Sequence, residues 1–184
     1  GQNQYCQVLC NPLYTAYRTT ESKDRLSVIM TLANWEAPRF RITEDALVYL
    51  AGSGVARWVA TAVAALPRDL EWTEAEFGKL LAERLPTLGL QQRRWVEEAA
   101  AVGAYRAQTT WPVAELLVCD DAPQWKGVTA DLMLCWVHEG RPYKKLMPVV
   151  ALHRQQLDDF LIRFWEYYAQ LLIYRQQPTP EECA

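Results

Sequence analysis

The sequence lacks a long apolar run, a net positive charge and all but two histidines. A membrane-spanning helix needs about 20 consecutive apolar residues, and no segment provides them. A formal net charge of −3 over 184 residues gives no global attraction to nucleic acid or to an anionic membrane, so any DNA contact has to be local. Five cysteines at irregular spacing fit free thiols better than a disulfide framework. We therefore expect a cytoplasmic protein with no membrane partner.

What the sequence does contain is typical of a folded domain. Hydrophobic residues make up 51% and charged residues 22%, which argues against a disordered chain. The length suits one good core, or a small domain with a helical insertion.

Residues 3–19 alternate loosely around Asn11-Pro12 and predict a β-hairpin. From Ser22 the apolar residues follow helical spacing up to Pro38. Residues 42–108 are rich in Ala, lack β-branched runs and predict three or four helices. One begins at Thr73, where Glu76 completes a capping box. Another spans residues 91–108.

Short apolar runs at 115–120 and 132–137 predict two buried strands. The short helical linker between them favours parallel pairing in a sheet covered by helices. A long amphipathic helix is expected over 151–175. The fold class is therefore α/β, with residues 1–36 as the first part of a domain, 37–110 as an all-helical insertion and 111–184 as the second part.

Thr179-Pro180-Glu181-Glu182 combines a capping box with proline at the first helical position, which is a strong helix start. Only two residues follow it. We therefore expect the chain to be an internal fragment of a longer protein.

Three blocks of the sequence resemble bacterial insertion-sequence transposases of the DDE class, whose catalytic domain is RNase H-like. The first block runs from Gly1 through Leu13–Tyr17 to Leu26, the second is Leu117–Trp125, and the third is Leu134–Leu146 with its Cys-x-x-His signature and basic tail. Trp165–Tyr168 and Pro178–Pro180 extend the likeness. The resemblance implies an incomplete RNase H-like mixed sheet, because the strand with the first catalytic aspartate and the helix with the catalytic glutamate would lie outside the chain.

Such transposases cleave and rejoin DNA at transposon ends with two Mg²⁺ or Mn²⁺ ions held by carboxylates. The second aspartate corresponds to Asp120 or Asp121. Alternation from Leu116 through Val118 selects Asp120 as the metal ligand, while Asp121 falls where a helix N-cap belongs. The alternative is a purely structural role, in which both aspartates only end the strand and cap the helix. With one carboxylate position of three, this fragment is expected to be inactive alone and to bind no metal tightly.

Cys135 and His138 form a lone pair without the two further ligands that structural zinc needs. The resemblance makes them a signature near the active site; the alternative is a core cysteine followed by a polar helix start. Lys126, Arg141, Lys144, Lys145 and Arg154 give residues 126–154 a local positive charge and are the candidate DNA contacts. The alternative is that they form a solvated surface, as charge clusters of this size more often do.

An RNase H-like sheet without its central strand has two open edges, so the fragment is expected to self-associate or to borrow a partner strand. Two other functions remain open. The chain could be a non-enzymatic helical interaction module, such as a domesticated transposase remnant. The other is a hydrolase that uses His138 or His153 with a cysteine, although no nucleophile motif accompanies either histidine.

Overall fold

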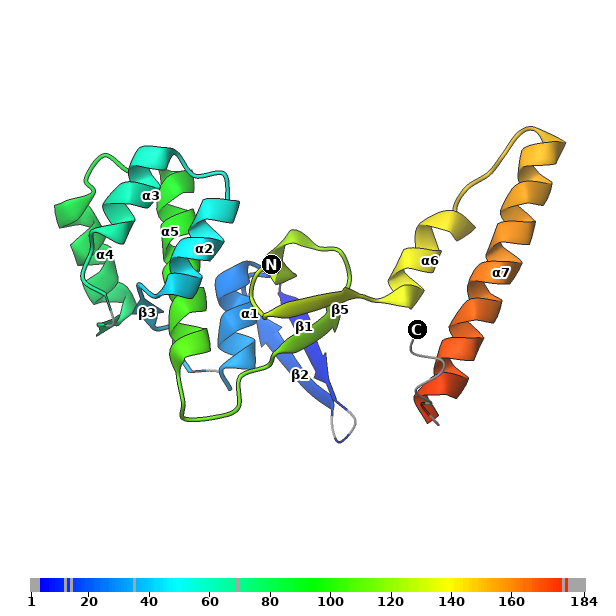
Figure 1. The fold of residues 1–184 in the computed structure, drawn as a ribbon, viewed down its shortest axis with the longest axis horizontal. Coiled ribbons are helices and arrows are strands. Elements are labelled where there is room, and N and C mark those ends of the chain that lie inside the picture. The colour runs from blue at the N-terminus through cyan, green and yellow to red at the C-terminus, as the bar shows by residue number, and fades with distance from the viewer. Residues whose placement is uncertain are drawn as a thin grey trace. The chain divides into compact units, whose positions relative to one another are not determined.

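The computed structural model describes residues 4–11, 13, 15–34, 36–68, 70–176 and 178. The fold is mixed α/β (Figure 1). It separates into two compact units, Gly1–Leu117 with Ala122–Leu132, and Val118–Asp121 with Met133–Ala184. The predicted domain boundaries at residues 36 and 110 stay predictions. The predicted helix start at Thr179 lies outside the described residues. No helix among the described residues is both long and apolar enough to cross a bilayer.

The first unit begins with the predicted hairpin. Strands β1 (Tyr5–Cys10) and β2 (Thr15–Thr20) pair antiparallel with Val8 opposite Tyr17. Helix α1 (Arg25–Leu32) follows, and the Asp24 side chain caps it by accepting from the Ser27 amide at 2.9 Å. The Thr31 hydroxyl on α1 donates to the buried Gln7 side-chain oxygen of β1.

Four helices follow, as the sequence predicts: α2 (Glu44–Gly52), α3 (Arg57–Ala64), α4 (Glu74–Arg84) and α5 (Leu90–Ala107). The capping box at Thr73 and Glu76 is confirmed. The segment is not wholly helical, because β3 (Phe40–Arg41) pairs antiparallel with β4 (Glu71–Trp72). This short β-ladder positions the Phe40 ring against the Phe77 ring, with the ring centroids 5.1 Å apart. The two strands therefore contribute to the core of the helical segment.

Helix α5 is the centre of the first unit (Figure 1) and packs against α1, α2 and β3. Its middle is made of small side chains, which allow close approach. A Cβ added to Gly103 would lie 2.6 Å from the Arg41 carbonyl oxygen and 2.9 Å from the Ala46 Cβ. Any side chain at position 103 would push α5 away from β3 and α2.

Strands β5 (Leu116–Cys119) and β6 (Asp131–Leu134) form a separate pair. The Asp131 amide donates to the Glu115 carbonyl at 2.8 Å and the Cys135 amide to the Cys119 carbonyl at 2.6 Å. Both strands thus advance in the same direction, which makes the pair parallel, as predicted. The predicted burial is wrong: Leu116, Val118, Met133 and Leu134 are about half exposed. In the described residues this pair has no further strand beside it and is a two-stranded sheet.

The second unit also holds α6 (Trp136–Lys144) and α7 (Ala151–Gln176). The predicted helix over 151–175 is confirmed. The predicted strand over 132–137 is too long, because the chain turns helical at Trp136. That residue packs its ring on Phe164 of α7, with centroids 4.6 Å apart, and so favours the helix. Gly140 makes this packing possible, since a Cβ there would lie 2.5 Å from the Trp165 ring.

Candidate functional site

The candidate site lies where β5 ends. Asp120 directly follows the strand and is half-buried, whereas Asp121 is exposed. The Cys119 thiol donates to the Asp120 carbonyl at 3.0 Å, which helps to fix the turn after the strand. The carboxylate predicted to bind metal is therefore partly shielded from solvent, and its neighbour is not.

The N-cap expected at Asp121 is wrong. The turn that follows is a single 3₁₀ turn, Pro123–Trp125, with Ala122 at the cap position and no side-chain cap bond. Pro123 is the sequence signal for a helix start at this point. Proline fixes the backbone angle of a first helical position, but it does not determine which preceding residue caps the helix.

Two arginines hold the loop that joins β5 to β6. Arg25 of α1 donates from Nη2 to the Pro123 carbonyl and from Nε to the Lys126 carbonyl, the latter at 3.2 Å. Arg106 of α5 donates to the Gly127, Val128 and Thr129 carbonyls at 3.1, 3.2 and 2.7 Å. Charge-assisted bonds to successive carbonyls fix the backbone of this loop.

A buried carboxylate anchors the first of these arginines. Glu98 of α5 is 3% exposed and accepts from Arg25 Nη1, from the Tyr49 hydroxyl at 3.1 Å and from Arg94 Nε at 3.1 Å. Burial raises the pKa of Tyr49 above its ordinary value, opposed by the nearby Arg25 charge and assisted by Glu98. Tyr49 therefore stays protonated and remains a hydrogen-bond donor to Glu98.

The loop itself is shaped to fit this anchor. Gly127 has a φ of 77°, and a Cβ there would lie 2.8 Å from the Tyr49 ring. The next residue, Val128, is fully buried in the helical core of the first unit. Only glycine combines the left-handed backbone with this close approach.

Sequence reasoning did not find this anchor. Two signals for it were present. Glu98 is an acidic residue among the Val and Ala positions that bury the middle of α5, and a buried carboxylate requires a cationic partner. Arg106 lies two residues after the last of these Ala positions, on the same helix.

The Cys-x-x-His pair lies at the start of α6. Cys135 occupies the N-cap position without a side-chain cap bond, and His138 is exposed in the first turn. The polar helix start that was left open as an alternative is thus present, but Cys135 is only half-buried. Among the described residues no group of three or more His, Cys, Asp or Glu side chains is placed to hold a metal ion. Asp120 and Asp121 would supply the oxygen ligands that Mg²⁺ prefers.

The predicted DNA contacts fall into both units. Lys126 belongs to the first unit, and its carbonyl is held by Arg25. Arg141 and Lys144 lie on the last turn of α6, and Lys145 is its C-cap. Lys144 Nζ lies 4.4 Å from the Trp165 ring centroid. Arg154, near the start of α7, donates to the Pro148 carbonyl at 3.4 Å. Three of these cations thus lie together at the C-terminal end of α6.

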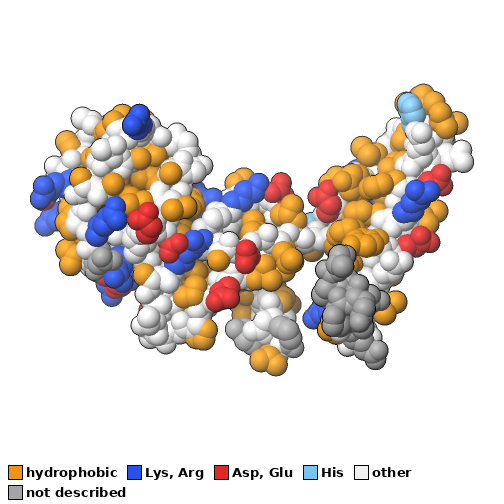
Figure 2. Space-filling view, viewed as in Figure 1, with side chains coloured by type: hydrophobic (Ala, Val, Ile, Leu, Met, Phe, Trp, Pro, Cys, Tyr) orange, Lys and Arg blue, Asp and Glu red, His pale blue; other side chains and the backbone are white. Residues whose placement is uncertain are grey.

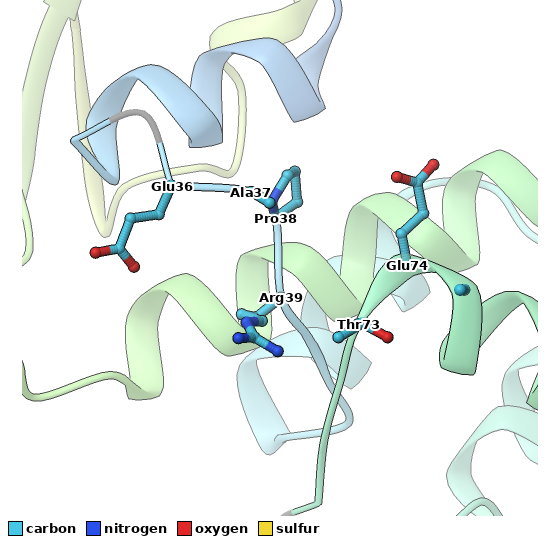
Figure 3. A pocket seen from close by; sticks show the side chains of 7 residues that line it. Glu36, Ala37, Pro38, Arg39, Thr73 and Glu74 are labelled. Atoms are coloured by element: carbon cyan, nitrogen blue, oxygen red, sulfur yellow. The ribbon is translucent and has the colours of Figure 1, made fainter.

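A surface pocket of about 750 Å³ opens elsewhere on the first unit (Figure 3). Glu36, Pro38 and Arg39 line it from the segment before β3, and Thr73 and Glu74 from the start of α4. Arg39 Nε lies 3.8 Å from a Glu71 oxygen, and Thr73 is occupied by its capping box. The pocket contains none of the residues predicted from the sequence.

Comparison with known proteins adds a distant relative. The chain is 28% identical over 172 residues to the uncharacterized protein y4jO of Sinorhizobium fredii (strain NBRC 101917 / NGR234). The alignment covers 91% of this chain and 51% of that protein. The chain thus spans about half the length of the curated relative it matches. No family model and no solved structure matches the chain. The name of the relative states no activity, so function has to be argued from the residues.

Proposed function

We propose that the chain is part of a DDE transposase of a bacterial insertion sequence. The parent protein cleaves DNA at transposon ends and joins the freed 3′-hydroxyl to target DNA in the cytoplasm, with Mg²⁺ or Mn²⁺ as cofactor. Asp120 is the metal ligand from this chain, and two further carboxylates come from outside it. The chain alone is inactive, because one carboxylate position cannot hold two metal ions.

The observation that carries the proposal is the parallel β5–β6 pair with Asp120 at its carboxyl end. A second observation is the division of the strands: among the described residues β1–β2 and β5–β6 are separate two-stranded sheets. A mixed sheet that lacks its central strand would leave these two pairs. The half-exposed Leu116 and Val118 on β5 agree with a sheet that is incomplete.

The loop that follows the two aspartates is held within the first unit. Arg25 and Arg106 hold the carbonyls that follow the aspartates, and Val128 buries the far end of the loop. A carboxylate that binds metal during phosphoryl transfer has to keep its geometry, and rigid elements achieve this better than free loops. Arg25, Arg106 and Glu98 thus fix the backbone of the loop after the aspartates within the first unit.

The basic turn of α6 is the proposed DNA contact in this chain. Neutralising Lys145 and Arg141 together, with Gln at both positions, is expected to weaken DNA binding by the complete protein uniformly across sequences. Removal of one phosphate-binding cation reduces the slope of log affinity against log salt by about 0.9. Lys144 is left intact because it packs on Trp165. Fluorescence anisotropy at several salt concentrations measures the slope; a slope equal to that of the wild type would show that these side chains are only a solvated surface.

A non-enzymatic interaction module is the second candidate. It is favoured by α7, in which no described residue is buried. The two proposals separate in one assay, because only a transposase cleaves DNA in a divalent-metal-dependent reaction. Such cleavage by the complete protein on its own element ends, abolished by EDTA, is expected under the leading proposal.

A further inference from the structure

A cleft of about 310 Å³ opens on the first unit beside the start of α1. Its walls come from the start of α1, the first half of α5 and the 3₁₀ turn Pro123–Trp125. Over the visible face of the first unit, basic and acidic side chains are interspersed (Figure 2), so the charges of a single cleft have to be counted one by one. The charged residues that line this cleft are Lys23, Asp24, Arg25, Arg94 and Glu98.

One buried carboxylate holds two of the cations. Glu98 accepts from Arg25 Nη1 on one oxygen and from Arg94 Nε on the other, the latter at 3.1 Å. A single negative charge thus faces two guanidinium groups, and one positive charge is left over. Arg25 is used within the fold, because its Nη2 and Nε donate to the Pro123 and Lys126 carbonyls. The surplus charge therefore belongs to Arg94.

Arg94 is exposed but held in place. Its side chain is 55% exposed, and the bond from Nε to Glu98 spans one turn of α5. Among the described residues, none forms a hydrogen bond or ion pair with Nη1 or Nη2 of Arg94. A guanidinium that is already oriented through Nε loses less conformational entropy when its terminal nitrogens bind an anion. Arg94 is thus a preorganised anion contact in the wall of the cleft.

Lys23 is the second cation of the cleft that is not consumed by the fold. It is exposed, and it forms no ion pair with a described residue. Its Nζ lies 5.6 Å from the Tyr5 ring centroid, so the aromatic ring gives the side chain a partial support. Lys23 can therefore turn its ammonium group to an anion without breaking an ion pair.

The second carboxylate of the cleft, Asp24, is committed to the start of α1. It caps the helix by accepting from the Ser27 amide at 2.9 Å. Burial raises its pKa, but hydrogen bonds from Ser27 and Ser22 and the charge of Arg94 hold the pKa below its ordinary value. Asp24 is therefore ionised at neutral pH. Three cations and two ionised carboxylates leave the cleft with one surplus positive charge.

We propose that this cleft binds one phosphate of a DNA backbone, with Arg94 and Lys23 as the contacts. A backbone phosphodiester carries one negative charge, which matches the surplus of the cleft. Guanidinium and ammonium groups are the usual phosphate contacts in protein–DNA interfaces. The choice of DNA as the source of the phosphate rests on the proposed function. The site belongs to the first unit and is additional to the cations of α6, which belong to the second.

Lys23→Gln in the complete protein tests the contact, because this residue holds no other part of the fold through an ion pair. Its affinity for duplex DNA of the transposon end is expected to fall about tenfold, since one charge-assisted contact is lost. The slope of log affinity against log salt is expected to become shallower by about 0.9. Arg94→Gln is expected to have the same two effects. Fluorescence anisotropy at several salt concentrations measures both quantities.

Arg93→Gln is the matched control, because it makes the same chemical change as Arg94→Gln at the neighbouring position of α5. Arg93 does not line the cleft, since it pairs with Glu97 and donates to the Gly78 carbonyl at 3.4 Å. Its DNA affinity and salt slope are expected to equal those of the wild type. Circular dichroism checks that all three variants keep their helix content.

Inorganic phosphate at constant ionic strength separates the two sources of a phosphate group. Millimolar phosphate is expected to leave DNA bound to the wild type. Displacement of DNA from the wild type but not from Lys23→Gln would assign the cleft to free phosphate and overturn the proposal. Wild-type affinity and salt slope in both Lys23→Gln and Arg94→Gln would overturn it as well. A wild type that binds DNA without cleaving it, with weaker binding by Lys23→Gln, would contradict the proposed activity and support the cleft.

Discussion

Replacing Glu98 by Gln is expected to lower the free energy of unfolding by about 3 kcal/mol or more. The substitution keeps the size of the side chain but removes the only charge on it. Arg25, whose side chain is 13% exposed, would then stay buried without its carboxylate. Breaking one side of a buried pair costs far more than the pair contributes, because the remaining charge is desolvated and uncompensated.

Glu97→Gln provides the matched control on the neighbouring position of α5. Glu97 pairs with Arg93 at 2.9 Å, but the two side chains are 28% and 38% exposed. Solvent screens such a pair, so the expected loss is within about 1 kcal/mol. Urea unfolding followed by circular dichroism measures both variants. Equal losses in the two variants would mean that the Glu98 network does not hold the first unit together.

The Glu98 variant also tests how the loop after the aspartates is held. Arg25 bridges Glu98 to the Pro123 and Lys126 carbonyls, so loss of the carboxylate releases one of the two arginines that hold the loop. Faster amide hydrogen exchange around residues 123–129 is the expected consequence of Glu98→Gln. Exchange in α6 and α7 serves as the internal reference.

Local signals in the sequence predicted most of the secondary structure. The Thr73 capping box, the hairpin around Asn11 and the long helix at 151 depend on neighbours within a few residues, and these were correct. The pairing of β5 with β6 was predicted as parallel from the short linker between them. Among the described residues, Cys6, Cys10 and Cys135 have free thiols, as expected.

Features that depend on distant contacts were missed. The apolar run at 132–137 has the pattern of a strand. The ring of Trp136, however, packs against Phe164 of α7, and this contact favours a helix from Trp136 onward. Apolar composition likewise predicted burial for β5, although composition cannot tell whether a covering strand is present. The Glu98–Arg25 anchor joins residues 73 positions apart, and no short motif encodes it.

Asp120→Asn in the complete protein is expected to reduce metal-dependent DNA cleavage by about 10³-fold or more. The proposed metal ion stabilises charge on the transferring phosphate, which is worth several kcal/mol in the transition state. Asparagine has nearly the same shape, but it lacks the negative charge that binds a hard divalent cation. DNA binding is expected to persist, because the cations of α6 are untouched.

The most direct test compares Asp120→Asn with Asp121→Asn in single-turnover cleavage of transposon-end DNA by the complete protein with Mg²⁺. The adjacent aspartates allow the same chemical change one residue apart, with anisotropy confirming that both variants bind the DNA. The account predicts loss of cleavage for Asp120→Asn and near-normal cleavage for Asp121→Asn. Cleavage that survives Asp120→Asn would contradict it.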